Sequence, residues 1–105
     1  MGAWDYGPFD NDDASDFWWE LRTATNPMKV LRARLNDNRQ GYELERRAAA
    51  VIVEFLSRFD RRTLNTMKKD AKKALEELLS GDWADTWDEP PKIRRELRKE
   101  IKRLQ

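Results

Sequence analysis

Carboxylates are the first residues of this chain whose types and spacing could do chemistry. The run DNDDASD places Asp12 and Asp16 one helical turn apart, on the same face of a helix. Such oxygens can bind hard cations or form a general acid/base pair. The run lacks the alternating ligands, central glycine and final glutamate of an EF-hand. Helix capping by Asp10 or Asn11 explains the same residues, so we expect no metal site and no catalytic pair.

Trp19 lies among these acids, away from the buried face of the same segment. That face is predicted by helical spacing and consists of Ala14, Phe17, Trp18 and Leu21. A Trp surrounded by carboxylates suits the anchor of a protein–protein interface. The steering charges of such an interface would be Asp12, Asp16 and Glu20. Alternatively, Trp19 packs under residues 1–10 or against the last helix.

The C-terminal segment offers a second candidate surface. Residues 90–105 carry seven bases and two acids, although the whole chain has a net charge of only +1. The bases that could bind nucleic-acid phosphates or an acidic partner are Arg94, Arg95, Arg98 and Lys102. Glu96 and Glu100 interrupt this run at spacings that suit surface pairs with bases such as Lys92 and Arg103. No DNA-reading motif accompanies the run, so nucleic-acid binding is the alternative interpretation.

The asymmetry of charge leaves two further alternatives open. Residues 1–20 carry six acids and no base, so the acidic and basic ends could pair within one molecule. They could also pair between copies of the chain. The sequence does not distinguish these alternatives and leaves the oligomeric state undetermined.

Composition narrows the classes of function. The 105 residues include no Cys and no His, which excludes zinc sites built from these residues and every His-dependent catalytic triad. No apolar stretch approaches the roughly 20 residues needed to span a bilayer, and no signal-peptide pattern opens the chain. We therefore expect a cytoplasmic, non-enzymatic protein with no cofactor and no membrane partner.

Apolar periodicity and helix stop signals predict an all-α fold, a compact bundle of about five helices in one domain over residues 1–105. Asn26-Pro27 and Pro90-Pro91 read as helix starts, and Ser80-Gly81 reads as a helix end. The expected elements are a docking loop at 1–10, helices at 11–24, 26–37, 41–59, 61–80 and 90–104, and a possible short turn at 82–88.

The third of these helices is predicted to be the most buried, because its middle, AAAVIV, is apolar nearly all round. Its expected core stripe includes Phe55 and Phe59. The docking loop should tuck its aromatic side chains, Trp4, Tyr6 and Phe9, into the body of the protein. The other tryptophans expected in the core or at seams between helices are Trp18, Trp83 and Trp87.

The opening motif GAWDYGPFDNDDA, with the phenylalanine that follows it, resembles a known bacterial family, the domain of unknown function 4259. The matching positions are Gly2, Ala3, Trp4, Gly7, Phe9, Asn11, Asp12, Ala14 and Phe17. Asp5 and Tyr6 stand where the family usually has a glycine and a small residue. A weaker likeness continues at residues 48–50 and at Trp87. The resemblance implies a small helical protein from a bacterium or phage, and it implies no activity.

These observations together favour a protein-binding module. An acidic surface with an aromatic anchor suits an immunity protein, an antitoxin or a phage-type inhibitor, because carboxylates can cover a basic cleft or imitate nucleic-acid phosphates. Electrostatic steering would speed association with a basic partner, and the anchor would slow release.

Overall fold

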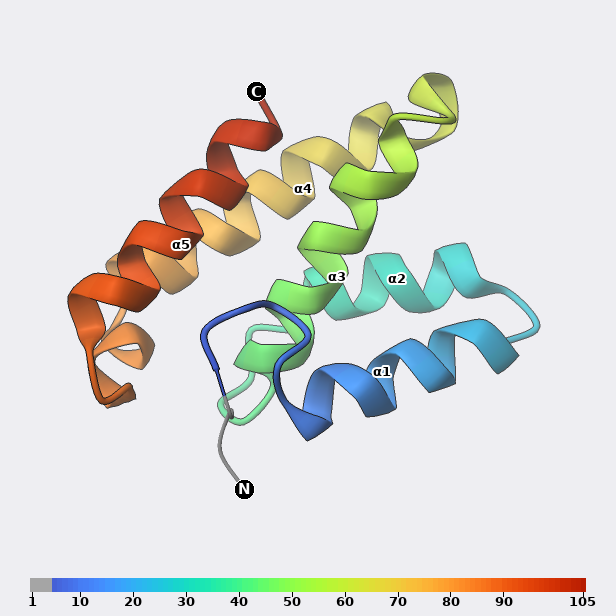
Figure 1. Cartoon of the computed structure of the whole chain (residues 1–105). Coiled ribbons are helices and arrows are strands. Elements are labelled where there is room, and N and C mark those ends of the chain that lie inside the picture. Colours follow the sequence, from blue (N-terminus) through green and yellow to red (C-terminus); the bar gives the residue numbers. More distant parts are fainter. Residues whose placement is uncertain (1–4) are drawn as a thin grey trace.

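The computed structural model describes residues 5–105, apart from the side chain of residue 63. These residues form five α-helices and one short 3-10 helix (Figure 1). The elements are α1 (Asp12–Thr23), α2 (Pro27–Leu35), α3 (Glu43–Ser57), α4 (Arg61–Ser80), η1 (Asp82–Thr86) and α5 (Pro90–Arg103). No strand occurs in the described part of the chain, and the predicted all-α bundle of about five helices is confirmed. Every α-helix begins and ends within two residues of its expected range.

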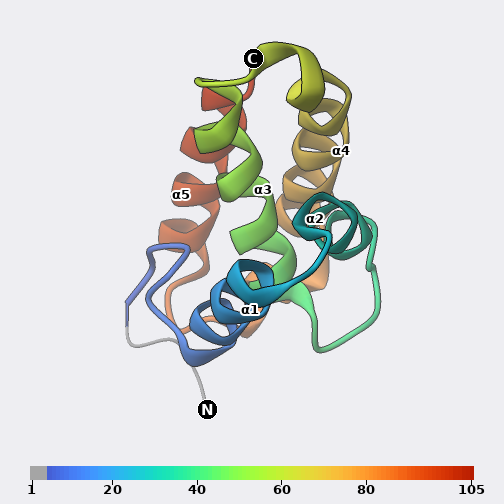
Figure 2. The same ribbon diagram turned by 90° about the vertical axis from the view of Figure 1, so that its right-hand side faces the viewer.

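The central element is α3. It packs along α4, which in turn packs along α5, while α1 and α2 both contact α3 (Figure 1). Figure 2 shows α3 between α5 and α4, with α1 crossing at its lower end. The radius of gyration over Cα atoms is 12.9 Å, close to the value of about 13 Å expected for a compact chain of this length.

Local sequence signals explain where the helices begin. Pro27 and Pro90 occupy the first helical positions of α2 and α5, where the missing N–H leaves no hydrogen bond unmade. Gly41 precedes α3 with a φ of +98°, in the left-handed region that side chains disfavour. Its N–H donates to Glu43 Oε1 at 2.9 Å. This hydrogen bond links the turn to the first residue of α3.

The core is formed by apolar side chains from all five α-helices. Small residues on α3, at positions 48–50, are fully buried and let neighbouring helices approach closely. The other core residues are Ala14, Phe17, Leu21, Leu31, Leu35, Ile52, Val53, Leu64, Met67, Ala71, Ala74, Leu75, Leu78, Ala84, Ile93, Leu97, Ile101 and Leu104. Burial of this apolar surface drives the bundle together.

A buried ion pair joins the N-terminal loop to α3 and α5. Arg47, with no exposed side-chain surface, donates from Nε and Nη2 to the Glu100 carboxylate at 2.9 and 2.6 Å. Its Nη2 also donates to the backbone oxygen of Tyr6 at 2.8 Å. The expected surface pairing of Glu100 with a base such as Arg103 is therefore wrong. Residue 100 lies on the inner side of α5, where it faces α3.

The aromatic ring of Tyr6 completes this docking. It packs on Trp87 with ring centroids 4.9 Å apart, and Lys92 Nζ lies 4.5 Å from its centroid. The N–H of Glu89 donates to the Tyr6 hydroxyl at 3.1 Å. Trp83 packs edge-on against Trp87 at 5.6 Å, and both indoles are half-buried. Trp4, expected in the same loop, lies outside the described residues.

Four aromatic residues expected to be buried are exposed instead. Trp18 is 46% exposed, Phe55 52%, Phe59 76% and Phe9 36%. The burial predicted for these four residues is wrong, because the neighbouring helices cover only part of α1 and α3 and leave the loop residues Phe9 and Phe59 uncovered. On α1 the covered stripe is narrow and consists of Ala14, Phe17 and Leu21. On α3 the last buried apolar residue is Val53.

We predict that Asn11→Ala lowers the free energy of unfolding by about 1–2 kcal/mol, as loss of a buried helix cap does. The Asn11 side chain is buried and accepts from the N–H of Ala14 at 2.7 Å. Asn26 caps α2 in the same way but is exposed, at 3.2 Å from the N–H of Lys29. Urea unfolding should therefore show a smaller loss for Asn26→Ala, and equal losses would contradict this account.

Candidate functional site

The outward face of α1 carries most of the residues predicted to bind a partner. Trp19 is 61% exposed, and the guanidinium carbon of Arg22 lies 5.1 Å from its ring centroid. Asp12 and Asp16 are exposed and form no ion pair within residues 5–105. Because α1 begins at Asp12, the helix dipole also favours negative charge at this end. The structure thus places an exposed indole and free carboxylates on one helix face.

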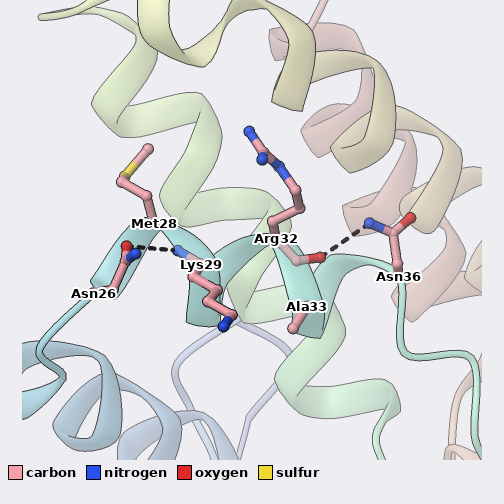
Figure 3. A pocket seen from close by; sticks show the side chains of 6 residues that line it. All are labelled: Asn26, Met28, Lys29, Arg32, Ala33 and Asn36. Carbon is pink, nitrogen blue, oxygen red and sulfur yellow. Dashed lines mark hydrogen bonds between the residues drawn. The ribbon is translucent and has the colours of Figure 1, made fainter.

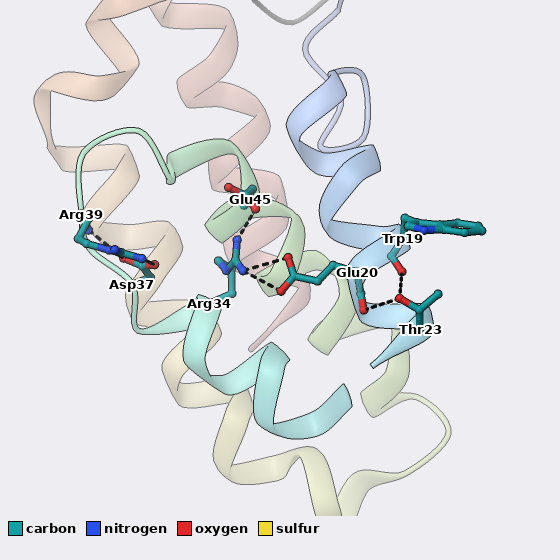
Figure 4. A network of polar contacts seen from close by, with 7 residues as sticks. All are labelled: Trp19, Glu20, Thr23, Arg34, Asp37, Arg39 and Glu45. Carbon is teal, nitrogen blue, oxygen red and sulfur yellow. Dashed lines mark hydrogen bonds and ion pairs between the residues drawn. The ribbon is translucent and has the colours of Figure 1, made fainter. Parts of the chain in front are cut away.

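Glu20 differs from these acids because it is already paired. Its carboxylate accepts from Arg34 Nη2 at 3.1 and 3.2 Å, and Arg34 Nη1 also donates to Glu45 (Figure 4). The Arg34 guanidinium lies 5.0 Å from the Phe17 ring centroid. Glu20 therefore joins α1 to α2. The acidic surface of α1 has fewer unpaired carboxylates than the sequence predicted.

The pKa values in this network follow from burial and pairing. Burial raises the pKa of Glu45, while the neighbouring Arg34 charge works in the opposite direction. In the loop after α2, the Arg39 side chain hydrogen-bonds Asp37 and lowers the pKa of that carboxyl to about 2 (Figure 4). Asp37 therefore stays ionised at neutral pH. Each of these two carboxylates is paired with an arginine.

An apolar groove lies between α1, α3 and the N-terminal loop, and we call it the aromatic groove. It has a volume of about 500 Å³ and is lined by Phe9, Ser15, Trp18, Val51, Ile52, Phe55 and Leu56. The exposed ring of Phe59 extends it, in edge-on contact with Phe55 at 5.4 Å. Pockets of this size and apolar character are typical binding sites.

Sequence reasoning missed the aromatic groove because it assigned these aromatic side chains to the core. The sequence of α3 contained one indication of this groove. Residues 51–56 are apolar on more than one side of the helix. Within one chain, only the sides that face a neighbouring helix become buried. Apolar residues on every side of α3 could therefore also have indicated a surface for a partner.

The basic face predicted on α5 is only partly free. Arg94 is half-buried, donates to Asp85 at 2.9 Å and binds the backbone oxygen of Leu79 at 3.2 Å, near the end of α4. It is therefore a structural link between α4, η1 and α5. Arg95, Arg98 and Lys102 are exposed and have no acidic partner in the described residues. Three of the four residues predicted for the basic interface on α5 are therefore available to a partner.

Two structural findings bear on metals and membranes. Among residues 5–105, no group of three or more His, Cys, Asp or Glu side chains is arranged to hold a metal ion. None of the described helices combines the length and the apolar character that crossing a bilayer requires.

The comparisons with known proteins identify a family. A family model described as "Domain of unknown function (DUF4259)" matches residues 2–55. This range covers the N-terminal loop, α1, α2 and most of α3, and so includes every residue that lines the aromatic groove except Leu56. No curated protein and no solved structure matches the chain.

Proposed function

The chain belongs to the DUF4259 family, which carries no assigned activity, and we propose that it is a non-enzymatic protein-binding module. The observation that carries this proposal is the clustering of exposed aromatic side chains. The structure exposes five large apolar side chains in the described residues, and four of them line or extend the aromatic groove. A contiguous apolar patch of this kind typically marks an interaction site.

Charge indicates the kind of partner. Asp12, Asp13 and Asp16 are exposed on the same helix as Trp18 and form no ion pair within the described chain. A partner segment with an apolar side chain for the groove and Lys or Arg beside it would match both features. Trp19, next to Trp18 along α1, would extend the contact as a second anchor.

A partner with a basic surface suits an inhibitory role. Carboxylates that cover a positive cleft would block a nucleic-acid-binding protein or a nuclease-like toxin, as immunity proteins, antitoxins and phage-type inhibitors do. We propose this class of role, in the cytoplasm of a bacterium or in phage infection. Binding through α5 is less favoured, because Arg94 is already engaged with Asp85 and the end of α4.

The experiment uses two synthetic amphipathic peptides, one of Leu and Lys and its twin of Leu and Glu. Fluorescence anisotropy of the labelled peptides with the full chain measures binding. We expect the Leu/Lys peptide to bind at least ten times more tightly than its twin. Asp12→Asn/Asp16→Asn should weaken its binding and reduce its salt dependence, and Trp19→Ala should weaken it as well.

The matched control is Asp82→Asn/Asp88→Asn, which removes the same charge from exposed positions elsewhere. It should leave the affinity for the Leu/Lys peptide within twofold of the unmodified chain. Equal binding of both peptides would contradict the proposal. So would equal losses in the two double variants, because these would show attraction to net charge alone.

A further inference from the structure

A second concave surface, which we call the basic hollow, lies at the C-terminal end of α3. The C-terminal end of α3, the first two turns of α4 and the end of α5 enclose it. Its volume is about 440 Å³, and its charged lining residues are Arg58, Arg61, Lys68, Arg103 and Glu54. Helical spacing places Arg58 next to Phe55, and the Arg58 guanidinium carbon lies 5.9 Å from the Phe55 ring centroid, so the basic hollow adjoins the aromatic groove.

The basic hollow has an excess of positive charge. Its one acidic side chain, Glu54, accepts from Arg58 Nη2 at 2.7 and 3.0 Å and is therefore neutralised. Arg61, Lys68 and Arg103 have no acidic partner in the described part of the chain. The charged side chains that line the hollow are therefore four cations and one anion. Cations that line one hollow repel one another, and a multivalent anion would relieve that repulsion.

The lining side chains are also of the types that bind phosphate oxygens. Guanidinium groups present planar pairs of N–H donors that match phosphate, and lysine adds a mobile point charge. The Asn65 side chain lies in the same lining and adds an amide donor. The volume falls in the range of about 300–1,000 Å³ found for small-ligand sites. From this convergence of three helices, we infer that the basic hollow binds a compact phosphate-bearing ligand with at least two negative charges.

The test titrates the full chain with inorganic pyrophosphate and follows backbone amide and arginine side-chain signals by NMR. We expect shifts to concentrate at residues 57–68 and 103–105. Arg61→Gln/Lys68→Gln should weaken pyrophosphate binding at least tenfold. Arg61 and Lys68 form no ion pair with an acid in the described residues, so circular dichroism should show unchanged folding of this variant.

The matched control removes two cations from another shallow surface pocket. Lys29 and Arg32 are exposed on α2, where they line a hollow with Asn26 and Asn36 (Figure 3). Lys29→Gln/Arg32→Gln should leave pyrophosphate affinity within twofold. Equal weakening in the two variants, or the absence of saturable binding at millimolar pyrophosphate, would overturn the inference.

A second binding experiment distinguishes a small phosphate-bearing ligand from a nucleic acid. A single-stranded oligonucleotide without terminal phosphates supplies the same phosphate chemistry along a chain. We expect it to bind more weakly than pyrophosphate and to be insensitive to Arg61→Gln/Lys68→Gln. Tighter binding of the oligonucleotide, lost in that variant, would overturn the assignment to a compact ligand.

Discussion

Glu100→Gln is expected to lower the free energy of unfolding by about 3–5 kcal/mol, the loss seen when one partner of a buried ion pair is removed. Glutamine keeps the shape of glutamate but removes its charge, and the Arg47 guanidinium then stays buried without a counter-charge. Its Nη1 already lacks a hydrogen-bond partner in the described chain, so no spare acceptor compensates. Urea unfolding followed by circular dichroism measures the loss.

The control lies one turn earlier on the same helix. Glu96 pairs with Lys99 at 3.3 Å, and the lysine side chain is 57% exposed, so Glu96→Gln should change stability by less than about 0.5 kcal/mol. The double variant Arg47→Met/Glu100→Leu should recover most of the stability lost in Glu100→Gln, because an apolar pair needs no counter-charge. Equal stability of Glu100→Gln and Glu96→Gln would contradict the buried pair.

Phe17→Ala and Trp18→Ala are expected to give opposite results, although these residues are neighbours in the sequence. Phe17 is fully buried in the core, so its loss should lower the free energy of unfolding by about 3–5 kcal/mol. Trp18 is 46% exposed in the aromatic groove, so Trp18→Ala should change stability by about 1 kcal/mol or less. Loss of a Trp anchor should instead weaken binding of the Leu/Lys peptide roughly 30-fold, or about 2 kcal/mol.

Thermal unfolding and fluorescence anisotropy on the same samples check both halves of this prediction. Phe55→Ala serves as a second groove variant, because Phe55 lines the opposite wall and is 52% exposed. It should behave like Trp18→Ala. A stable Trp18→Ala protein with unchanged affinity for the Leu/Lys peptide would show that the aromatic groove does not bind this peptide.

The helices could be predicted from the sequence because their signals are local. Asn11, Asn26-Pro27 and Pro90-Pro91 mark helix starts by hydrogen bonds and φ values that depend on near neighbours only. The apolar stripe of α4 and α5 likewise follows from helical spacing. Such features need no knowledge of which helices pack together.

The buried ion pair could not be predicted in this way. Glu100 stands at a spacing that suits surface pairs along α5, and its true partner, Arg47, lies 53 residues earlier. Only the packing of α5 against α3 makes that pair. Arg47 follows another arginine in a helix, and nothing in its sequence neighbourhood distinguishes a buried arginine from a solvated one.

The candidate site could be predicted only in part. Helical spacing placed Trp19 and the acids near it on one face of α1, but it left open whether Trp19 is exposed or packs under another segment. The aromatic groove did not follow, because apolar spacing does not distinguish a face that packs within the chain from one left for a partner. Trp18 and Phe55 show this limit, since both continue apolar stripes that the neighbouring helices leave uncovered.

The central claim is that the aromatic groove binds an apolar anchor flanked by basic residues. NMR titration of the full chain with the Leu/Lys peptide tests it most directly, since tryptophan indole N–H signals report on separate regions. The account predicts shifts of the Trp18 indole and of amides 51–56, with the Trp83 and Trp87 indoles unchanged. An unchanged Trp18 indole at saturating peptide, with shifts located elsewhere, would contradict it.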